Sequence, residues 1–305
     1  MATGMGGATG PTRTQMLAAW AIVYGVWSST YLAIRIAVAD IPPGLLAGIR
    51  FSAAGLLLIG VARLRGNPFP SGMREWRVIA VMGIALVTVG NGAVTWAEQW
   101  VPSNQAALLI ASSAFWMAWF GSFGPNGTPI GRGTWLGILM GFIGVALLLM
   151  PQGLDDGTGE PRHLLPMAVI VVSSLFWCGG TIYGRNAGLE LRPMMLAGCQ
   201  MLIGGILLWA IGLGAGETQR VAWTPAGIIG LVYLTLFGSC LAYGTYVWLI
   251  RQTSPARLST IAYVTPAVAT VLGWWVLDET LSGTQLTGMF VTLFGVVTVA
   301  RTSPG

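Results

Sequence analysis

The chain has 305 residues, of which 54% are hydrophobic and 8% are charged. Soluble domains carry about 25% charged residues, so this composition excludes a soluble globular protein and indicates a membrane protein. All fifteen basic residues are arginine, which excludes chemistry that needs a Schiff-base lysine or a P-loop lysine.

Apolar segments of roughly 18 to 25 residues, each able to cross a hydrocarbon core of about 30 Å, follow one another along the chain. Ten are predicted, at 16–39, 43–62, 76–97, 102–123, 133–150, 164–184, 193–213, 224–250, 255–277 and 283–300. The longest connection between them runs from 151 to 163 and is too short for a soluble domain. Residues 1–15 are rich in Gly and Thr and are predicted to form a disordered tail.

The arginines flank these segments unevenly. With the N-terminus inside, eleven arginines lie on inner connections and two on outer ones. This positive-inside bias predicts a multi-pass membrane protein with both termini in the cytoplasm. Because the basic residues are spread over many connections, the net charge of +5 is no sign of nucleic-acid binding.

The two halves of the chain resemble each other. At a shift of 150 positions, Trp27 and Arg35 fall on Trp177 and Arg185, and Gly55 falls on Gly205. Each half holds five predicted helices, an odd number, so the second half crosses the membrane in the opposite sense. Inverted repeats of this kind suit alternating access to a site near the midplane.

The predicted fold is therefore an all-α membrane protein with ten transmembrane helices, arranged as two inverted-topology five-helix repeats around a central cavity. Its parts are a cytoplasmic tail at 1–15, a first repeat at 16–150, an outer linker at 151–163, a second repeat at 164–300 and a cytoplasmic tail at 301–305.

Polar and aromatic residues recur at helical spacing within the apolar segments. Trp27 and Tyr31 share one stripe of the first predicted helix, and Asn91 and Thr95 share one stripe of the third. Lipid does not solvate such groups, so these faces turn inward to hydrogen-bond between helices or to line a cavity. The candidate substrate-binding residues are Trp27, Tyr31, Arg50, Asn91, Thr95, Trp177, Gln200 and Tyr243.

Arg50 is the sharpest of these hypotheses. It is predicted to lie roughly 10 Å inside the outer boundary of the membrane, where an unpaired arginine costs several kcal/mol. It can offer a fixed cation to a substrate carboxylate or phosphate. The alternatives are a structural pair with Glu98 or with a helix carbonyl, or a side chain that snorkels to the outer face. Snorkelling is the expectation for Arg35 and Arg185, which lie near segment ends.

A series of short motifs follows the order found in one family. They are WSSTY at 27–31, GNG at 90–92, EQ at 98–99, VPS at 101–103, FGS at 237–239, AY at 242–243, TP at 265–266 and DE at 278–279. On these motifs the chain resembles the EamA family of the drug/metabolite transporter superfamily, and it looks closest to the bacterial YedA-like members. The resemblance covers nearly all of 16–300. It implies a bacterial inner-membrane location, ten helices, cytoplasmic termini, a central cavity and export of small metabolites such as amino acids.

Other classes of function find less support in the sequence. Intramembrane proteolysis needs histidine at helix depth, whereas the one histidine, His163, lies in the predicted outer linker. The three cysteines lack CxxC spacing and are expected to be buried apolar residues. We therefore expect no enzyme activity, no cofactor and no metal. A channel remains an alternative, and efflux of hydrophobic cations is a closer one, because aromatic rings attract cations.

The sequence leaves the coupling of transport open. No carboxylate lies near the middle of a predicted segment, so a midplane proton relay is not expected. If transport is coupled to protons, the candidates are Glu98, Asp278 and Glu279 at outer helix ends; facilitated diffusion and exchange are the simpler alternatives. The expected partners are a small-molecule substrate and the lipid bilayer, without nucleic acid, and the chain is expected to be monomeric.

Overall fold

The computed structural model describes residues 11–123, 127, 129–149, 164–253, 255–258 and 261–302. Over these ranges the chain is helical and contains no strand, in agreement with the all-α prediction. The predicted linker 151–163 and the first ten residues of the predicted tail lie outside them.

The first half of the chain contains α1 (Arg13–Val38), α2 (Pro43–Leu64), α3 (Met73–Met82), η1 (Gly83–Asn91), α4 (Gly92–Ala97), α5 (Ser103–Ile110), α6 (Ser113–Phe120) and α7 (Arg132–Leu149). The second half contains α8 (Leu164–Ala187), α9 (Pro193–Gly214), η3 (Glu217–Arg220), α10 (Pro225–Tyr233), η4 (Leu234–Tyr243), α11 (Gly244–Gln252), α12 (Pro255–Leu258), α13 (Ile261–Leu277) and α14 (Gly283–Thr302). Both η1 and η4 are π-helical and join their neighbours without a break, so 73–97 and 225–252 are each one long helix.

Local signals explain where several helices begin and end. Proline stands at the first position of α2, α9 and α10, where its fixed φ favours a helix and its missing N–H costs nothing. Thr12 and Gln15 form a capping box at the start of α1. Past the end of α2, Gly66 adopts a φ of +74°, a left-handed conformation that glycine accepts without strain.

Six helices are long and apolar enough to cross a membrane within the described part of the chain. They span Arg13–Val38, Pro43–Leu64, Met73–Ala97, Leu164–Ala187, Pro193–Gly214 and Pro225–Gln252. The other predicted segments are shorter. The segment 102–123 breaks at Ala111 and Ser112 into α5 and α6, and apolar helices of less than this length occupy 132–147, 264–277 and 283–299.

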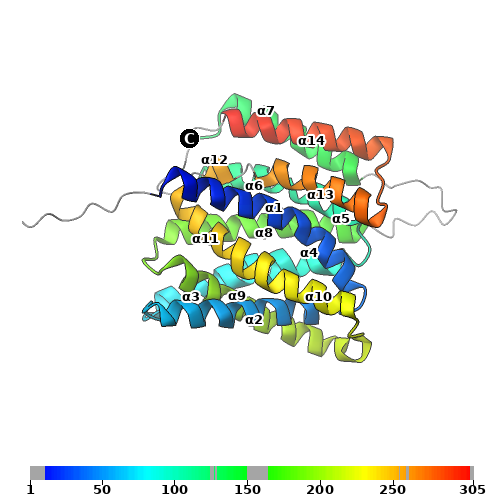
Figure 1. Cartoon of the computed structure of the whole chain (residues 1–305). Coiled ribbons are helices and arrows are strands. Elements are labelled where there is room, and N and C mark those ends of the chain that lie inside the picture. The colour runs from blue at the N-terminus through cyan, green and yellow to red at the C-terminus, as the bar shows by residue number, and fades with distance from the viewer. Residues whose placement is uncertain are drawn as a thin grey trace, which may run out of the picture.

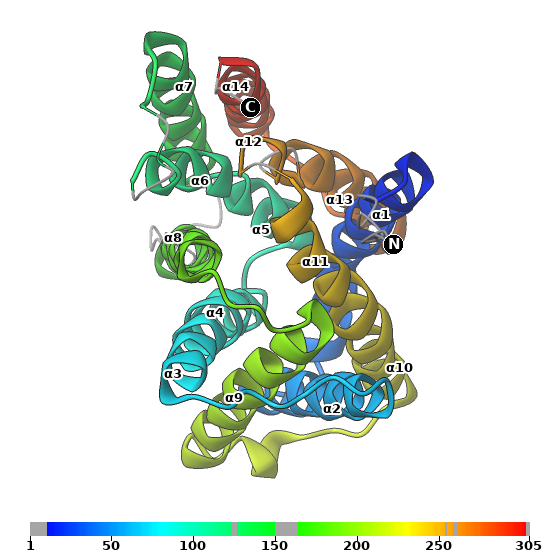
Figure 2. The same cartoon turned by 90° about the vertical axis from the view of Figure 1, so that its left-hand side faces the viewer.

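The helices lie side by side with their axes roughly along one direction, and α1 begins on the same side of the molecule where α14 ends (Figure 1). Seen end-on, α7 and α14 form one edge of the stack, and α2 and α9 form the other (Figure 2). The remaining long helices, including α1, α8 and α13, lie between these two pairs. They therefore enclose the centre of the molecule.

Close glycine contacts hold α2 against α9, and these contacts are reciprocal. A Cβ on Gly55 would lie 2.7 Å from the Leu202 nitrogen, and a Cβ on Gly205 would lie 2.5 Å from the Ser52 nitrogen. The 150-residue shift of the sequence repeat turns the first pair of residues into the second, because position 55 becomes 205 and position 202 becomes 52. The same relation holds for Gly48 with Trp209 and Gly198 with Ile59. Gly44 and Gly48 belong to the same interface: a Cβ on either would lie 2.7 Å from a backbone Cα of α9, so these small residues allow the close packing.

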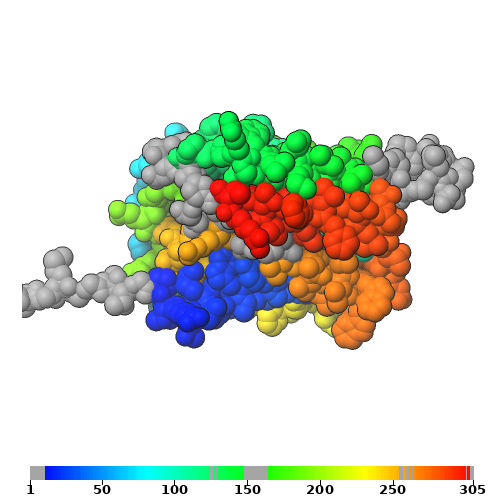
Figure 3. Space-filling view, turned by 90° about the horizontal axis from the view of Figure 1, so that it is seen from above, coloured from blue at the N-terminus to red at the C-terminus, as the bar shows by residue number. Residues whose placement is uncertain are grey.

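The α7–α14 pair presents an apolar outer face. Figure 3 shows the two helices side by side on one surface of the molecule. The large apolar side chains exposed on them are Trp135, Leu136, Leu139, Ile143, Leu286, Phe290 and Phe294. An apolar surface of this breadth on long helices suits contact with lipid.

Candidate functional site

A cavity of about 110 Å³ lies at the centre of the helix stack. Both halves of the chain build its wall: α1, α2, η1, α4, α5 and α6 contribute from the first half, and α8, α11, α12 and α13 from the second. The space is large enough to hold water or a small ligand group.

Interrupted helices shape one side of this cavity. The break between α5 and α6 brings Ser112 to α8, where its hydroxyl lies 2.9 Å from that of Ser174. Next to α5, Pro266 stands inside α13, where a proline removes one backbone hydrogen bond and bends the helix. The neighbouring Thr265 lines the cavity, and its Oγ1 has no hydrogen-bond partner among the described residues. This side of the wall therefore offers polar atoms in an otherwise apolar region.

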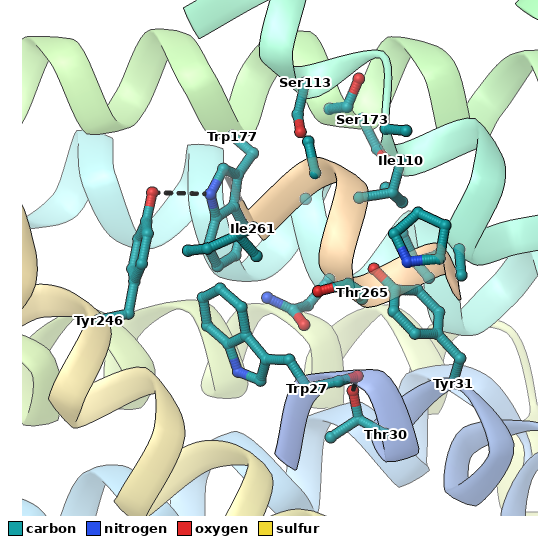
Figure 4. Close-up of a pocket in the computed structure, with 18 of the residues that line it drawn as sticks. Trp27, Thr30, Tyr31, Ile110, Ser113, Ser173, Trp177, Tyr246, Ile261 and Thr265 are labelled. Carbon is teal, nitrogen blue, oxygen red and sulfur yellow. Dashed lines mark hydrogen bonds between the residues drawn. The ribbon is translucent and has the colours of Figure 1, made fainter. Parts of the chain in front are cut away.

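An aromatic cluster forms another side. The Trp27 ring of α1 meets the Trp177 ring of α8 edge to face, with centroids 5.7 Å apart, and Tyr246 of α11 packs against both. The Trp177 Nε1 donates to the Tyr246 hydroxyl at 3.1 Å, and the Trp27 Nε1 donates to the carbonyl of Gly238 at 3.4 Å. Figure 4 shows Trp27 and Trp177 on the same side of the cavity as Tyr246. Their hydrogen bonds hold the rings in fixed orientations.

Arg50 reaches the cavity from α2 and is 3% exposed. Its Nε donates to the Ser239 hydroxyl at 2.8 Å, and its guanidinium lies 4.4 Å from the centroid of the Phe51 ring. Its Nη1 has no hydrogen-bond partner in the part of the chain that the structure describes. The guanidinium is thus fixed through its Nε and keeps an unused hydrogen-bond donor at Nη1.

The π-helix η1 places Asn91 on the cavity wall. Its amide nitrogen donates to the carbonyl of Leu86, five residues earlier, at 3.0 Å. One turn later, Thr95 donates from its hydroxyl to the carbonyl of Asn91 at 2.9 Å. A π-helical stretch often marks a functional position because it rotates the side chains that follow it.

Charged groups gather beyond the end of α4. Glu98 is fully buried, and neither of its carboxylate oxygens has a hydrogen-bond partner among the described residues. Arg35 is half-buried and donates to the backbone carbonyl of Glu98. The considered pair between Arg50 and the Glu98 carboxylate is not formed. Arg185 is exposed near the end of α8 and donates to the carbonyls of Ile250 and Thr253.

Of the candidate residues from sequence, the structure brings together Trp27, Tyr31, Arg50, Asn91 and Trp177 on the cavity wall. Thr95, Gln200 and Tyr243 are buried outside the wall. The Tyr243 hydroxyl donates to the Gln200 side chain at 2.9 Å, so these two residues satisfy each other behind the Trp177 ring. They form an interhelical hydrogen bond, which was the alternative for polar groups in membrane helices.

The candidate set also leaves out residues that line the cavity, above all Tyr246, with Ser113, Ser173 and Thr265. Tyr246 follows Tyr243 by three residues, so regular spacing puts both on one stripe and cannot choose between them. The π-helix that ends at Tyr243 changes the phase of the helix, and the sequence pattern carries no sign of it.

These features define a helical membrane protein with a small, aromatic-lined cavity at its centre and one buried guanidinium on the wall. The chain belongs to the EamA-like transporter family, whose pattern matches residues 15–150 and again residues 164–301. The two matches cover both halves of the chain and confirm the resemblance seen in the sequence.

Individual relatives agree with this assignment. The chain is 37% identical over 278 residues to the "Uncharacterized inner membrane transporter YedA" of Escherichia coli K12, covering 91% of this chain and 88% of that protein. It is 29% identical over 286 residues to a WAT1-related chloroplastic protein of Arabidopsis thaliana, covering 90% and 66% of the two chains. A solved crystal structure superposes with a TM-score of 0.67 over 95% of this chain and 98% of that chain; at 17% identity, this shows a shared fold.

Proposed function

We propose that this protein exports small amphiphilic metabolites that carry a carboxylate, such as amino acids or related zwitterions, across the inner membrane. The observation that carries the proposal is the position of Arg50, a buried guanidinium on the wall of the central cavity with an unpartnered Nη1. Such a group binds carboxylates through charge-assisted hydrogen bonds. The rings of Trp27, Trp177 and Tyr246 suit an apolar substrate body beside it.

The proposed mechanism is alternating access between two inverted five-helix repeats, 16–150 and 164–300. It is supported by the reciprocal contacts of α2 with α9, which pair equivalent positions of the two halves. It is also supported by η1 and η4, the π-helices at equivalent places in the third long helix of each half. Two similar halves that pack face to face in opposite senses can exchange roles and expose the cavity to either side.

We further propose ten membrane crossings, the shorter ones being α5 with α6, α7, α12 with α13, and α14. Both termini then face the cytoplasm, and 151–163 links the repeats on the outer side. The arginine distribution supports this orientation. In this arrangement the protein has no catalytic step, and its partners are the substrate and the surrounding lipid.

Efflux of hydrophobic cations is the rival proposal, supported by the aromatic wall. Arg50 argues against it, since a cation in this cavity would meet an uncompensated positive charge. The described wall also carries no carboxylate that would attract a cation.

Three probes that share a phenyl ring separate these proposals: 3-phenylpropionate, phenylalanine and phenethylamine. They carry a carboxylate, both charged groups, and an ammonium, respectively. Efflux from proteoliposomes is expected for the first two and not for the third. The Arg50→Gln variant is expected to lose about tenfold or more of the phenylpropionate rate, as removal of one buried charge-assisted contact predicts.

The matched control is Arg63→Gln, which removes an arginine from the exposed end of the same helix and is expected to transport as the wild type does. Unchanged efflux of phenylpropionate by Arg50→Gln would contradict the role of Arg50. Efflux of phenethylamine alone would replace the proposal with its rival.

A further inference from the structure

Glu98 is a buried carboxylate that takes no part in the proposed binding of a substrate carboxylate by Arg50. It directly follows α4 and has no exposed surface. Its two oxygens lack hydrogen-bond partners among the described residues, although its backbone carbonyl accepts a hydrogen bond from Arg35. A buried carboxylate without donors is costly in its ionised form, so its environment favours the protonated form.

The titratable groups that face Glu98 come from each side. Tyr31 and Arg35 belong to α1, Arg50 to α2, and Glu279 to the connection between α13 and α14; all four act on Glu98 electrostatically. The α8 helix, which also packs against α4, carries its charged residue Arg185 at its far end. Glu98 therefore lies between two cations and one other carboxylate.

The two neighbouring carboxylates differ in their hydrogen bonds. Glu279 accepts from the backbone nitrogen and the hydroxyl of Ser103, each at 2.8 Å, and from the backbone nitrogen of Asn104 at 3.0 Å. These donors, at the start of α5, give both Glu279 carboxylate oxygens hydrogen-bond partners. Glu98 has no such donors within the described structure. Glu98 is thus the one of the two carboxylates that is fully buried and lacks donors, and these surroundings favour its protonated form.

We propose that Glu98 binds a proton together with the substrate, so that a carboxylate at Arg50 and a proton at Glu98 each strengthen the binding of the other. The inference rests on the proposed function and identifies the proton as the ion to which transport is coupled. An ionised Glu98 partly compensates the charge of Arg50, and its protonation leaves Arg50 free to attract a carboxylate. The proton moves from solvent to a Glu98 oxygen, the substrate stays ionised, and the pair adds no net charge to the carrier.

The sign of the pH dependence follows. Glu98 stands outside the span Met73–Ala97, and burial together with the charge of Glu279 raises the pKa of its carboxyl well above the ordinary range. Below that pKa Glu98 is protonated and carboxylate binding is strongest. As the pH rises through the pKa, Glu98 ionises and the affinity falls, by at most about tenfold per pH unit for one linked proton.

Calorimetric titration of the purified wild type with 3-phenylpropionate tests this directly. Measured in buffers of different ionisation enthalpy over about pH 5 to 9, binding is expected to take up as much as one proton. The Glu98→Gln variant is expected to bind with a pH-independent affinity and no proton uptake. The matched control is Glu217→Gln, a buried carboxylate that accepts from the backbone of Leu45 away from the cavity; it keeps the wild-type linkage.

The wild-type measurement decides the matter even if Glu98→Gln folds poorly. Binding of phenylpropionate without proton uptake at any pH would overturn the inference and leave the proposed function standing. Retention of the linkage in Glu98→Gln would overturn it as well. Failure of the wild type to bind any carboxylate probe would instead overturn the proposed function, and this inference with it.

Discussion

The packing of α2 against α9 can be tested by one added methyl group. In Gly205→Ala the new Cβ would lie 2.5 Å from the Ser52 nitrogen and 2.9 Å from the Phe51 carbonyl carbon. Ordinary contacts of this kind are about 3.5 to 4.0 Å, and backbone atoms cannot turn aside, so the helices must separate by about 1 Å. Overpacking of a close interface costs about 1 to 3 kcal/mol. For a chain of this size that lowers the melting temperature by about 2 to 12 °C.

The measurement is the melting temperature of the detergent-solubilised protein, followed by size-exclusion chromatography after heating. Gly60→Ala is the control, because a Cβ at Gly60 in α2 meets no atom within 4 Å. We expect Gly55→Ala to cost as much as Gly205→Ala, because the two contacts are reciprocal. The double variant should cost less than the sum, since one separation relieves both contacts. Equal melting temperatures for Gly205→Ala and Gly60→Ala would refute the packing argument.

Two further variants test the cavity wall. Trp177→Phe keeps a ring but removes the donor to Tyr246, so we expect about a three- to tenfold loss of phenylpropionate affinity by calorimetry. The control Trp223→Phe, at an exposed position in the connection before α10, should have no effect. An unchanged affinity would assign Trp177 to packing alone. Ser112→Ala removes the hydrogen bond to Ser174 and should lower the free energy of unfolding by about 0.6 kcal/mol. Its melting temperature should therefore lie below that of the control Ser122→Ala. Equal melting temperatures would show that the Ser112–Ser174 contact contributes nothing.

Much of the fold could be predicted because membrane segments are specified by composition. Apolar length, proline at helix starts and arginine at segment ends are local signals. They place the start of α2 at Pro43 and that of α9 at Pro193, as the structure does. The break at Ala111 and Ser112 could not be predicted, since both residues fit an apolar helix and the interruption depends on packing against α8.

The candidate site was predictable where two independent signals agreed. Trp27 and Trp177 each lie on a polar and aromatic stripe of their own helix, and they occupy equivalent positions in the sequence repeat. Both line the cavity. Tyr243 is also a candidate from sequence, but its hydroxyl donates to Gln200, and Tyr246 lies on the cavity wall in its place. The burial of Glu98 was not predictable either. It stands at a segment end, where exposure is the usual expectation, and its surroundings come from distant parts of the chain.

Counterflow in proteoliposomes tests most directly whether the central cavity serves a carrier. Vesicles loaded with unlabelled 3-phenylpropionate are diluted into a trace of the labelled compound. A carrier that exposes one site to alternate sides returns with labelled substrate, so we expect a transient accumulation of label above the outside concentration. The accumulation should disappear in Arg50→Gln and persist in Arg63→Gln. Simple equilibration of label without accumulation in the wild type would indicate a channel and would contradict alternating access.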